Sequence, residues 1–264
     1  MQIPDIPSEL FYTFNDVVYY DEPHKYFLDD KPLTSVTTLI HRYEEEFNEE
    51  YWSDIKSKEF NVSQNEIKYA WNFINKKATT KGSIIHDYTE NIFLNKIFPY
   101  PKLYIENKFG YDVVYDEYEK TKRQVDRFYH MSKNRLIPIK TEFIVFDREY
   151  MIGGMVDILF WNVKAQEFQI WDYKTNKNFT FESKTGENLT GKLYLLENCD
   201  LEKYSLQLSS YKYIIEKNTS IKLGKSYLVW FSHLNDNYEI IETKNREYYV
   251  KEMFEDNILY NIIN

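Results

Sequence analysis

The chain has one cysteine, no long apolar run and no excess of basic residues, and each shortage narrows what the protein can be. Among its 264 residues, Cys199 is the single cysteine, which excludes an internal disulfide framework and any four-cysteine zinc or iron–sulfur site. No apolar run approaches the roughly 20 residues that a membrane-spanning helix requires. The first residues lack the basic-then-apolar pattern of a signal peptide. We therefore expect a cytoplasmic protein without a membrane partner, in the host cytoplasm if a phage encodes it.

The shortage of basic residues bears directly on nucleic acid as a partner. Lys and Arg number 33 against 42 Asp and Glu, so the net charge is −9. A sequence-independent DNA binder usually carries a basic surface, because neutralising phosphates releases counterions. The acidic balance therefore counts against nucleic acid. It does not exclude it, since metal-binding carboxylates add negative charge and a local basic track can coexist with an acidic remainder.

The residues that are present predict a folded chain with a helical beginning. Hydrophobic residues make up 43% and aromatic residues 18%, which is enough for a sizeable core. The β-rich stretch 11–33, with turn residues at Asp21–Pro23 and Asp29–Asp30, predicts a hairpin. Helices are then predicted from Ser35 or Thr34, as the cap, to about residue 47, and over 51–60, 63–77 and about 82–95.

The second half of the chain alternates between helical and strand patterns. A helix over about 112–133 precedes three apolar runs, 142–146, 155–161 and 168–174, that read as successive strands. The remaining elements are a polar loop at about 175–199, a helix at 201–217, a hairpin at 225–243 and a helix at 246–259. This order predicts an α/β (α+β) fold, with a central mixed β-sheet flanked by helices and a helical N-terminal region. We expect one compact unit, with residues 1–81 as the N-terminal hairpin and helical region and 82–264 as the core.

A carboxylate two residues before a lysine is the first candidate for chemistry, although the short pattern occurs seven times in the chain. Context favours Asp172, because strand alternation places it on the same face as Lys174. One strand earlier, Asp157 lies inside an apolar run, where a charge is costly unless it is paired or bound to a metal. If the two strands form a hairpin, both carboxylates can bind one Mg²⁺ or Mn²⁺ ion. The alternative is a structural salt bridge between Asp157 and Lys174.

Two helices carry further polar pairs at a spacing of four residues, which places each pair on one helix face. His86 and Glu90 combine an imidazole with a carboxylate that can bind a metal, or they form an ordinary pair on a capped helix. Gln207 and Tyr211 can bind a phosphate or hold the lysine, or they form the polar edge of an amphipathic helix. Either pair alone favours the structural interpretation.

Taken in order along the chain, these residues form a set of five motifs. The motifs are Gly82-Ser-Ile-Ile-His86, Glu142, Gly154-Met-Val-Asp157, Asp172-Tyr-Lys-Thr175 and Gln207-Leu-Ser-Ser-Tyr211. Together they resemble the RecB-like branch of the PD-(D/E)XK nuclease superfamily, over about residues 82–215. A shorter match at His24-Lys-Tyr and Ser35-Val-Thr-Thr is similar to mitochondrial genome maintenance exonucleases and related phage exonucleases.

The resemblance implies a role for each residue of the central motifs. His86, Asp157 and Asp172 would bind the metal through their side chains, and Tyr173 through its carbonyl. Lys174 would be the catalytic lysine, which orients the attacking water or stabilises charge on the phosphate.

The remaining motifs would support this centre. Glu142 would lie near the metal, in its outer surroundings or at a second metal, and Gln207 and Tyr211 would support Lys174 and the scissile phosphate. Some relatives carry an iron–sulfur cluster on four cysteines, and Cys199 alone excludes that subtype.

The function predicted from these residues is a divalent-metal-dependent DNA nuclease, most simply an exonuclease, that hydrolyses phosphodiester bonds with metal-activated water and lysine assistance. Its expected partners are single-stranded DNA or DNA ends, with replication or recombination proteins as further candidates. The first alternative is a catalytically inactive DNA- or partner-binding module that keeps the fold. The second is a glycosidase with paired carboxylates, in which Lys174 and His86 have no obvious place.

The helical region before Gly82 offers a second kind of contact with DNA. It contains several lysines together with Trp52, Tyr69 and Trp71, and aromatic side chains in a basic setting can stack on bases. Aromatic residues on helices more often belong to a core, so we expect core positions for these three.

Overall fold

The structure is a computed structural model that describes the backbone of residues 4–20, 25–96 and 111–263. Side chains are described for the same residues except 111–115. The turn expected at Asp21–Pro23 and the motif residue His24 lie outside the described residues.

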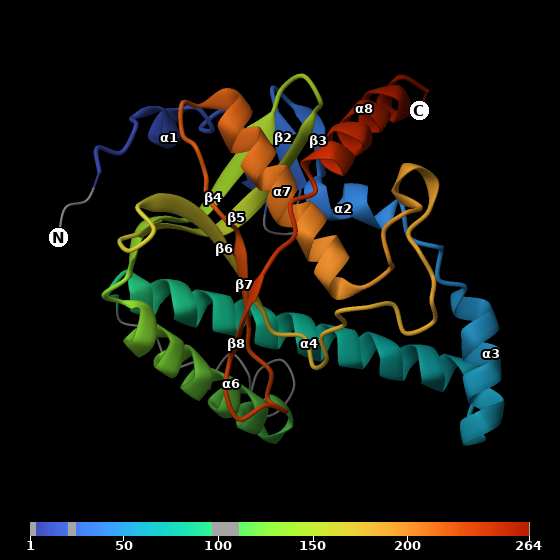
Figure 1. The fold of residues 1–264 in the computed structure, drawn as a ribbon. Coiled ribbons are helices and arrows are strands. Elements are labelled where there is room, and N and C mark those ends of the chain that lie inside the picture. The colour runs from blue at the N-terminus through green and yellow to red at the C-terminus, as the bar shows by residue number, and fades with distance from the viewer. Residues whose placement is uncertain (1–3, 21–24, 97–110, 264) are drawn as a thin grey trace.

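The centre of the described chain is a mixed sheet of eight strands, as the alternating patterns predict (Figure 1). Its order is β1-β2-β3-β5-β6-β7-β8, with β4 paired to β5 outside this path. The β3–β5 and β6–β7 pairs are parallel and the other pairs are antiparallel. The strands are β1 (Val17–Tyr20), β2 (Lys25–Leu28), β3 (Lys31–Ser35), β4 (Leu136–Asp147), β5 (Ile152–Asn162), β6 (Glu167–Lys174), β7 (Tyr227–Trp230) and β8 (Glu239–Glu242).

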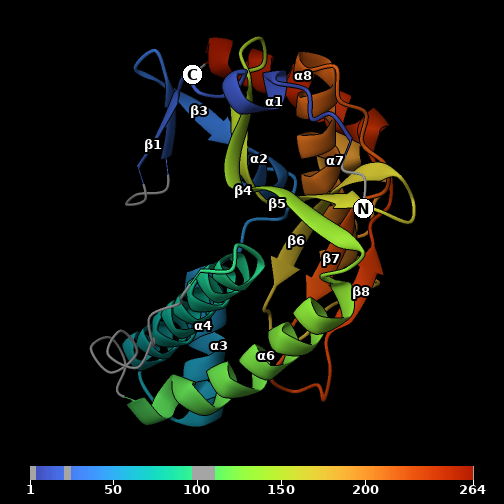
Figure 2. The same ribbon diagram turned by 90° about the vertical axis from the view of Figure 1, so that its left-hand side faces the viewer.

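Helices cover both faces of this sheet. In Figure 1, α7 lies across one face, while α4 and α6 run beneath the strands, and Figure 2 shows α4 and α6 side by side. The fold is therefore the α+β arrangement that the order of elements predicts. The helices are α1 (Glu9–Tyr12), α2 (Val36–His41), α3 (Glu49–Phe60), α4 (Gln64–Phe93), α6 (Tyr111–Ser132), α7 (Asp200–Asn218) and α8 (Glu247–Ile263), with a short 3₁₀ turn at Gly191–Leu193.

Two apolar cores follow from the alternation of side chains along the central strands. Ile170 on β6 packs on the side of α2, α7 and α8, and its neighbour Trp171 packs on the side of α4 and α6. Leu228 and Val229 on β7 divide in the same way. The sheet is buried on both faces here, so a polar side chain on these strands needs a specific partner.

Helix α4 differs from the expectation, because the two helices predicted over 63–77 and 82–95 are one continuous helix. Its start is a capping box, in which Ser63 accepts from the Glu66 N–H and Glu66 accepts from the Ser63 N–H. Gly82 does not end the helix, since a glycine inside a helix costs only about 1 kcal/mol relative to alanine. The expected division between residues 81 and 82 falls inside this helix and stays a prediction.

Helix α2 is shorter than expected, ending at His41 rather than near residue 47. Its start agrees with the prediction, because the Ser35 side chain accepts from the Thr38 N–H at 3.0 Å. Three acidic residues, Glu44–Glu46, follow the helix. Negative charge at a helix C-terminus opposes the helix dipole, which accounts for the early end.

Candidate metal centre

The β5–β6 hairpin opens at Asp157. The registered pairs between the two strands run from Asn162 and Glu167 to Ile158 and Trp171. Beyond that point β6 continues its pairing with β7 alone. The side chain of Asp157 then supplies the hydrogen-bond acceptor that the backbone of β5 no longer provides. Its Oδ2 accepts from the Tyr173 N–H at 2.7 Å. A carboxylate is therefore held at the point where two central strands separate.

Glu142 on β4 lies opposite Asp157, because the pairs Thr141–Ile158 and Phe143–Val156 flank it. Its backbone has a φ of 42°, the left-handed region that residues other than glycine seldom adopt. Such a conformation costs about 1–3 kcal/mol and is typical of functional sites. Sequence reasoning gave no sign of this backbone, although the structure shows β4 to be irregular just before it, with a register shift between Pro138 and Lys140.

Helix α4 brings His86 to the two carboxylates. The His86 Nδ1 lies 3.4 Å from Asp157 Oδ2. One potential ligand atom from each of His86, Glu142 and Asp157 lies within 4.8 Å of the others. Glu90, one turn after His86, instead accepts from Thr141 Oγ1 at 2.7 Å and so ties α4 to β4. An imidazole and two carboxylates from three elements thus form a set of donors that suits a divalent cation.

Negative charge is poorly compensated at this centre. Burial, with the nearby carboxylate of Asp157 as the second cause, raises the pKa of Glu142 to about 9. The same two causes raise the pKa of Asp172 to about 6. Carboxyl groups that resist ionisation in this way would be stabilised as carboxylates by a bound cation.

Asp172 and Lys174 lie beside this set and are paired with each other. Lys174 Nζ is 2.6 Å from Asp172 Oδ2. Burial alone would lower the pKa of Lys174, but the carboxylate of Asp172 outweighs burial and raises it. The salt bridge expected as an alternative joined Asp157 to Lys174, whereas in the structure the partner of Lys174 is Asp172. The reason is strand alternation, which places Asp172 and Lys174 on one face of β6.

Helix α7 closes the site on the far side of Lys174. The side chain of Gln207 accepts from Lys174 Nζ at 3.2 Å and donates to the Tyr211 hydroxyl at 3.1 Å. A Cβ on Gly154 would lie 2.6 Å from the Tyr211 ring, so only glycine allows this approach. Sequence reasoning missed Tyr204, whose ring centroid lies 4.4 Å from Lys174 Nζ. Its position one turn before Gln207 is the signal that could have found it.

The structure thus brings the residues of all five motifs to one region, in two neighbouring groups. His86, Glu142 and Asp157 form the first group, and Asp172 with Lys174 begins the second. Tyr173 contributes its main chain, while its ring is buried on the opposite face of the sheet. The second group is completed by Gln207 and Tyr211 of α7.

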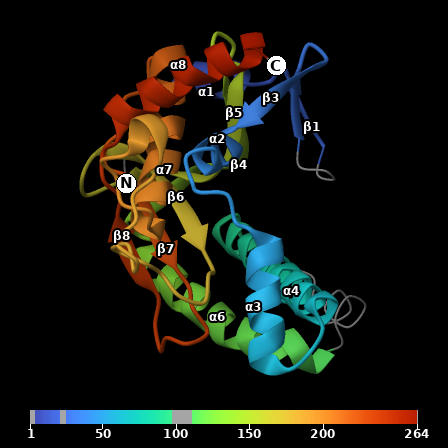
Figure 3. The same cartoon turned by 90° about the vertical axis from the view of Figure 1, so that its right-hand side faces the viewer.

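The helices before Gly82 form an arm, and its aromatic residues are not core residues as expected. Figure 3 shows α3 lying across the N-terminal part of α4. Trp52 is 43% exposed and Tyr69 is 74% exposed, and only Trp71 is partly buried. The first half of α4 extends past the sheet toward α3 (Figure 1), so the sheet does not cover these side chains.

Comparison with known proteins adds little to this geometry. No protein-family model matches the chain, and no curated protein matches it. A solved structure described as "Crystal structure of SSO0001" is similar over 69% of this chain and 86% of its own, at 13% identity and a TM-score of 0.27. At that TM-score the likeness carries no argument. Among the described residues, no helix is long and apolar enough to cross a membrane.

Proposed function

We propose that the chain is a divalent-metal-dependent DNA nuclease that hydrolyses phosphodiester bonds. The observation that carries the proposal is the meeting of His86, Glu142 and Asp157 within 4.8 Å, beside the paired Asp172 and Lys174. A structural salt bridge would need one carboxylate and one lysine. It would not need two further buried or half-buried carboxylates and an imidazole at the same point.

The residues present fit a resident Mg²⁺ or Mn²⁺ ion. His86, Glu142 and Asp157 would hold it, and the raised pKa values of Glu142 and Asp172 reflect negative charge that a cation would stabilise. When bound, such an ion polarises a phosphoryl oxygen and lowers the pKa of a coordinated water. Tyr173 supports the site through its N–H, which fixes the carboxylate of Asp157.

Lys174 is the residue best placed to act on the substrate itself. Its ammonium group stays charged because Asp172 lies 2.6 Å away, and Gln207 and the Tyr204 ring limit its movement. A fixed ammonium group can donate to a non-bridging phosphate oxygen and stabilise the charge that develops there. Gln207 and Tyr211 position Lys174 and Asp172 rather than contact the reacting atoms.

DNA is proposed as the substrate from the resemblance, and the helical arm supports it. Exposed Trp52 and Tyr69 can stack on bases, as aromatic side chains of proteins that bind single strands do. The exonuclease mode, acting on single strands or on DNA ends, rests on the resemblance alone. Replication or recombination partners are proposed on the same ground, whereas a cytoplasmic location is proposed because the sequence has no long apolar run.

The test is cleavage of labelled single- and double-stranded DNA with Mn²⁺ or Mg²⁺, comparing the natural protein with Lys174→Ala and Asp172→Asn. Both variants should lose cleavage, by about a hundredfold or more for a charge-stabilising group. Lys164→Ala is the matched control, because Lys164 is exposed in the turn at the opposite end of β6. Equal cleavage in all four proteins would contradict the proposal.

Two further outcomes separate the alternatives. DNA binding without cleavage, together with no Mn²⁺ binding by calorimetry, would identify a binding module that keeps the fold. Cleavage of closed circular DNA would contradict the exonuclease mode while leaving the nuclease intact.

A further inference from the structure

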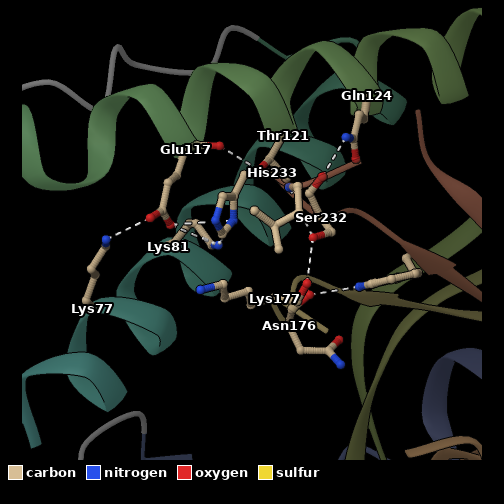
Figure 4. A network of polar contacts seen from close by, with 11 residues as sticks. Lys77, Lys81, Glu117, Thr121, Gln124, Asn176, Lys177, Ser232 and His233 are labelled. Carbon is tan, nitrogen blue, oxygen red and sulfur yellow. Dashed lines mark hydrogen bonds and ion pairs between the residues drawn. The ribbon is translucent and has the colours of Figure 1, made fainter. Parts of the chain in front are cut away.

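A second charged cluster, of the opposite sign, includes Lys81, five residues before His86 on α4 (Figure 4). Lys77 and Lys81 reach it from α4, Glu117 from α6, Lys177 from the segment after β6 and His233 from the segment after β7. We call these five residues the basic cluster. Four separate parts of the chain meet here, so the arrangement exists only in the folded protein.

Glu117 is the centre of the contacts in the basic cluster. Its Oε1 accepts from Lys77 Nζ at 2.7 Å, and its Oε2 lies 3.3 Å from Lys81 Nζ. Lys81 is 4% exposed and also donates to His233 Nδ1 at 3.2 Å, an arrangement that requires a neutral imidazole. Burial lowers the pKa of His233, and the ammonium group of Lys81 lowers it further. His233 therefore adds no positive charge at neutral pH.

The charges of the basic cluster do not balance. Three lysines face one carboxylate, which leaves two positive charges in excess. Lys177 is exposed, and no carboxylate pairs with it among the residues that the structure describes. Its main chain is fixed, because its carbonyl accepts from Ser232 Oγ at 2.8 Å, and Figure 4 shows its side chain extending toward Lys81 and His233.

Repulsion within the cluster argues for a ligand of negative charge. Burial lowers the pKa of Lys81, and the ammonium groups of Lys77 and Lys177 oppose its charge as well. Placing like charges together is unfavourable unless a counter-charge completes the arrangement. Lys77 and Lys81 share the single carboxylate of Glu117, and Lys177 has no carboxylate partner among the described residues, so Lys177 is the lysine available for an external anion.

The basic cluster and the metal centre are joined through two pieces of chain. Gly82, directly after Lys81, lies so close to Thr175 that a Cβ there would be 3.2 Å from Thr175 Oγ1. Thr175 in turn lies between Lys174 and the segment that carries Lys177. Along α4, Lys81 precedes His86 by five residues, an axial distance of about 7.5 Å with a rotation of about 140° about the helix axis. A strand bound at the metal centre would therefore lie within about one and a half helical turns of the basic cluster along α4.

We propose that the basic cluster binds a phosphate group of the nucleic-acid strand, next to the phosphate that is cleaved. This inference rests on the proposed function. Lys177 holds the phosphate as a point charge, which suits the flexible ammonium group of lysine, and Lys77, which shares Glu117 with Lys81, adds positive charge beside it. Lys81 and Glu117 keep the cluster in place. The site also supplies the local positive charge that the acidic composition, with a net charge of −9, does not predict.

The test measures how tightly a fluorescent single-stranded oligonucleotide binds in EDTA, where cleavage does not occur, at several salt concentrations. Each phosphate contact contributes about 0.7 to the slope of log affinity against log salt for a single strand. Lys177→Ala should lower that slope by about this amount, and lower affinity about fivefold to tenfold at low salt. Lys164→Ala removes the same charge from an exposed site at the other end of β6 and should behave as the natural protein does. Equal slopes for all three proteins would overturn the proposal.

A neutral methylphosphonate, introduced at one phosphate at a time, locates the contact. One position should weaken binding to the natural protein, and the same position should have no further effect in Lys177→Ala. Additive losses at every position would overturn the proposal. Binding of inorganic phosphate that requires Lys177 but does not compete with the oligonucleotide would assign the site to free phosphate instead of a strand, and would overturn the proposal as stated.

The outcome is separable from that of the proposed function. If the natural protein cleaves DNA and Lys177→Ala keeps its slope, the phosphate site fails and the nuclease stands. If no metal-dependent cleavage occurs but the slope falls in Lys177→Ala alone, the nuclease fails and the phosphate site stands.

Discussion

The metal centre and the basic cluster lie on the same helix, carry opposite charge and are built in different ways. At the metal centre, the carboxylates of Glu142 and Asp157 face each other on neighbouring strands, with His86 of α4 above them. At the basic cluster, the long side chains of Lys77 and Lys81 contact Glu117 from a helix, and that of Lys177 extends toward Lys81 from a loop. Each site has an excess of one charge that the protein itself does not balance.

The difference in construction indicates a difference in task. Short side chains on hydrogen-bonded strands have few rotatable bonds, so the positions of Glu142 and Asp157 are fixed by the backbone. Such rigidity suits an ion that requires a defined set of ligands. Lysines have long flexible stems, which suit attraction of a phosphate without a single geometry. The comparison predicts that small changes at the metal centre strongly reduce metal binding and cleavage. Changes at the basic cluster should alter the affinity for an oligonucleotide only gradually.

The largest effect is expected from Asp157→Asn, which keeps the shape and an acceptor for the Tyr173 N–H but removes one charge. Mn²⁺ binding should be lost by calorimetry, and cleavage should fall about a thousandfold, since a bound metal contributes several kcal/mol to catalysis. Binding of an oligonucleotide in EDTA should be retained, because the basic cluster is unchanged. Asp147→Asn is the control, as Asp147 is also buried on β4 but pairs with Lys217 at 2.9 Å. An equal loss in both variants would mean that the fold, and not the metal centre, had failed.

Gly82→Ala tests whether the two sites are coupled. The added methyl group would lie 3.2 Å from Thr175 Oγ1 and displace the segment that connects Lys174 to Lys177. We expect cleavage to fall about tenfold, which corresponds to about 1.4 kcal/mol, while helix propensity gains up to about 1 kcal/mol. The double variant Gly82→Ala, Thr175→Ala should recover most of the activity. No recovery would show that Gly82 acts through some other contact.

Much of the fold was predictable because the alternation of side chains along the sequence marks the strands and the face on which each residue lies. Alternation along 168–174 placed Asp172 and Lys174 on one face, and the apolar run around Asp157 indicated a buried carboxylate. Backbone geometry was not predictable, since nothing around Glu142 signals a positive φ. The basic cluster was also beyond sequence reasoning. Lys81, Glu117 and His233 are far apart in sequence, and only the packing of α4 and α6 on the sheet brings them together.

Glu142→Gln should stabilise the metal-free protein, because glutamine removes a carboxyl group whose ionisation is opposed by burial and by the carboxylate of Asp157. With the pKa of Glu142 raised to about 9, the folded protein holds a proton that the unfolded chain releases above about pH 4.5. The natural carboxyl therefore costs stability increasingly as pH rises through this window, and glutamine removes the cost. We expect a gain of about 1 kcal/mol at pH 8, seen as about 2–4 °C in Tm, and no gain below pH 4.5. A gain that is independent of pH would point to packing instead of charge.

The smallest effect is expected from Glu117→Gln, which keeps a hydrogen-bond acceptor and removes the carboxylate that offsets the lysines of the basic cluster. Affinity for an oligonucleotide in EDTA should rise by about twofold to threefold. A change of this size lies within the energy of one surface ion pair, which is at most about 1 kcal/mol. The measurement is the same fluorescence titration, and Glu119→Gln on the same helix serves as control. Lower affinity in a folded Glu117→Gln protein would mean that Glu117 orders the lysines and does not merely oppose the phosphate.

Helix α4 fixes the axial distance between Lys81 of the basic cluster and His86 of the metal centre. From Lys81 to His86 the chain has no bend or loop, because both residues lie inside one 30-residue helix. A single extra residue between them would rotate His86 by about 100° and shift it by about 1.5 Å, so length there is constrained even where side-chain identity is not. If both proposals hold, the helix keeps Lys81 at a set axial distance from the ion, so the basic cluster would reach only phosphates a short way along the strand from the one at the ion. The place of cleavage would then depend on position along the backbone, without any base being read.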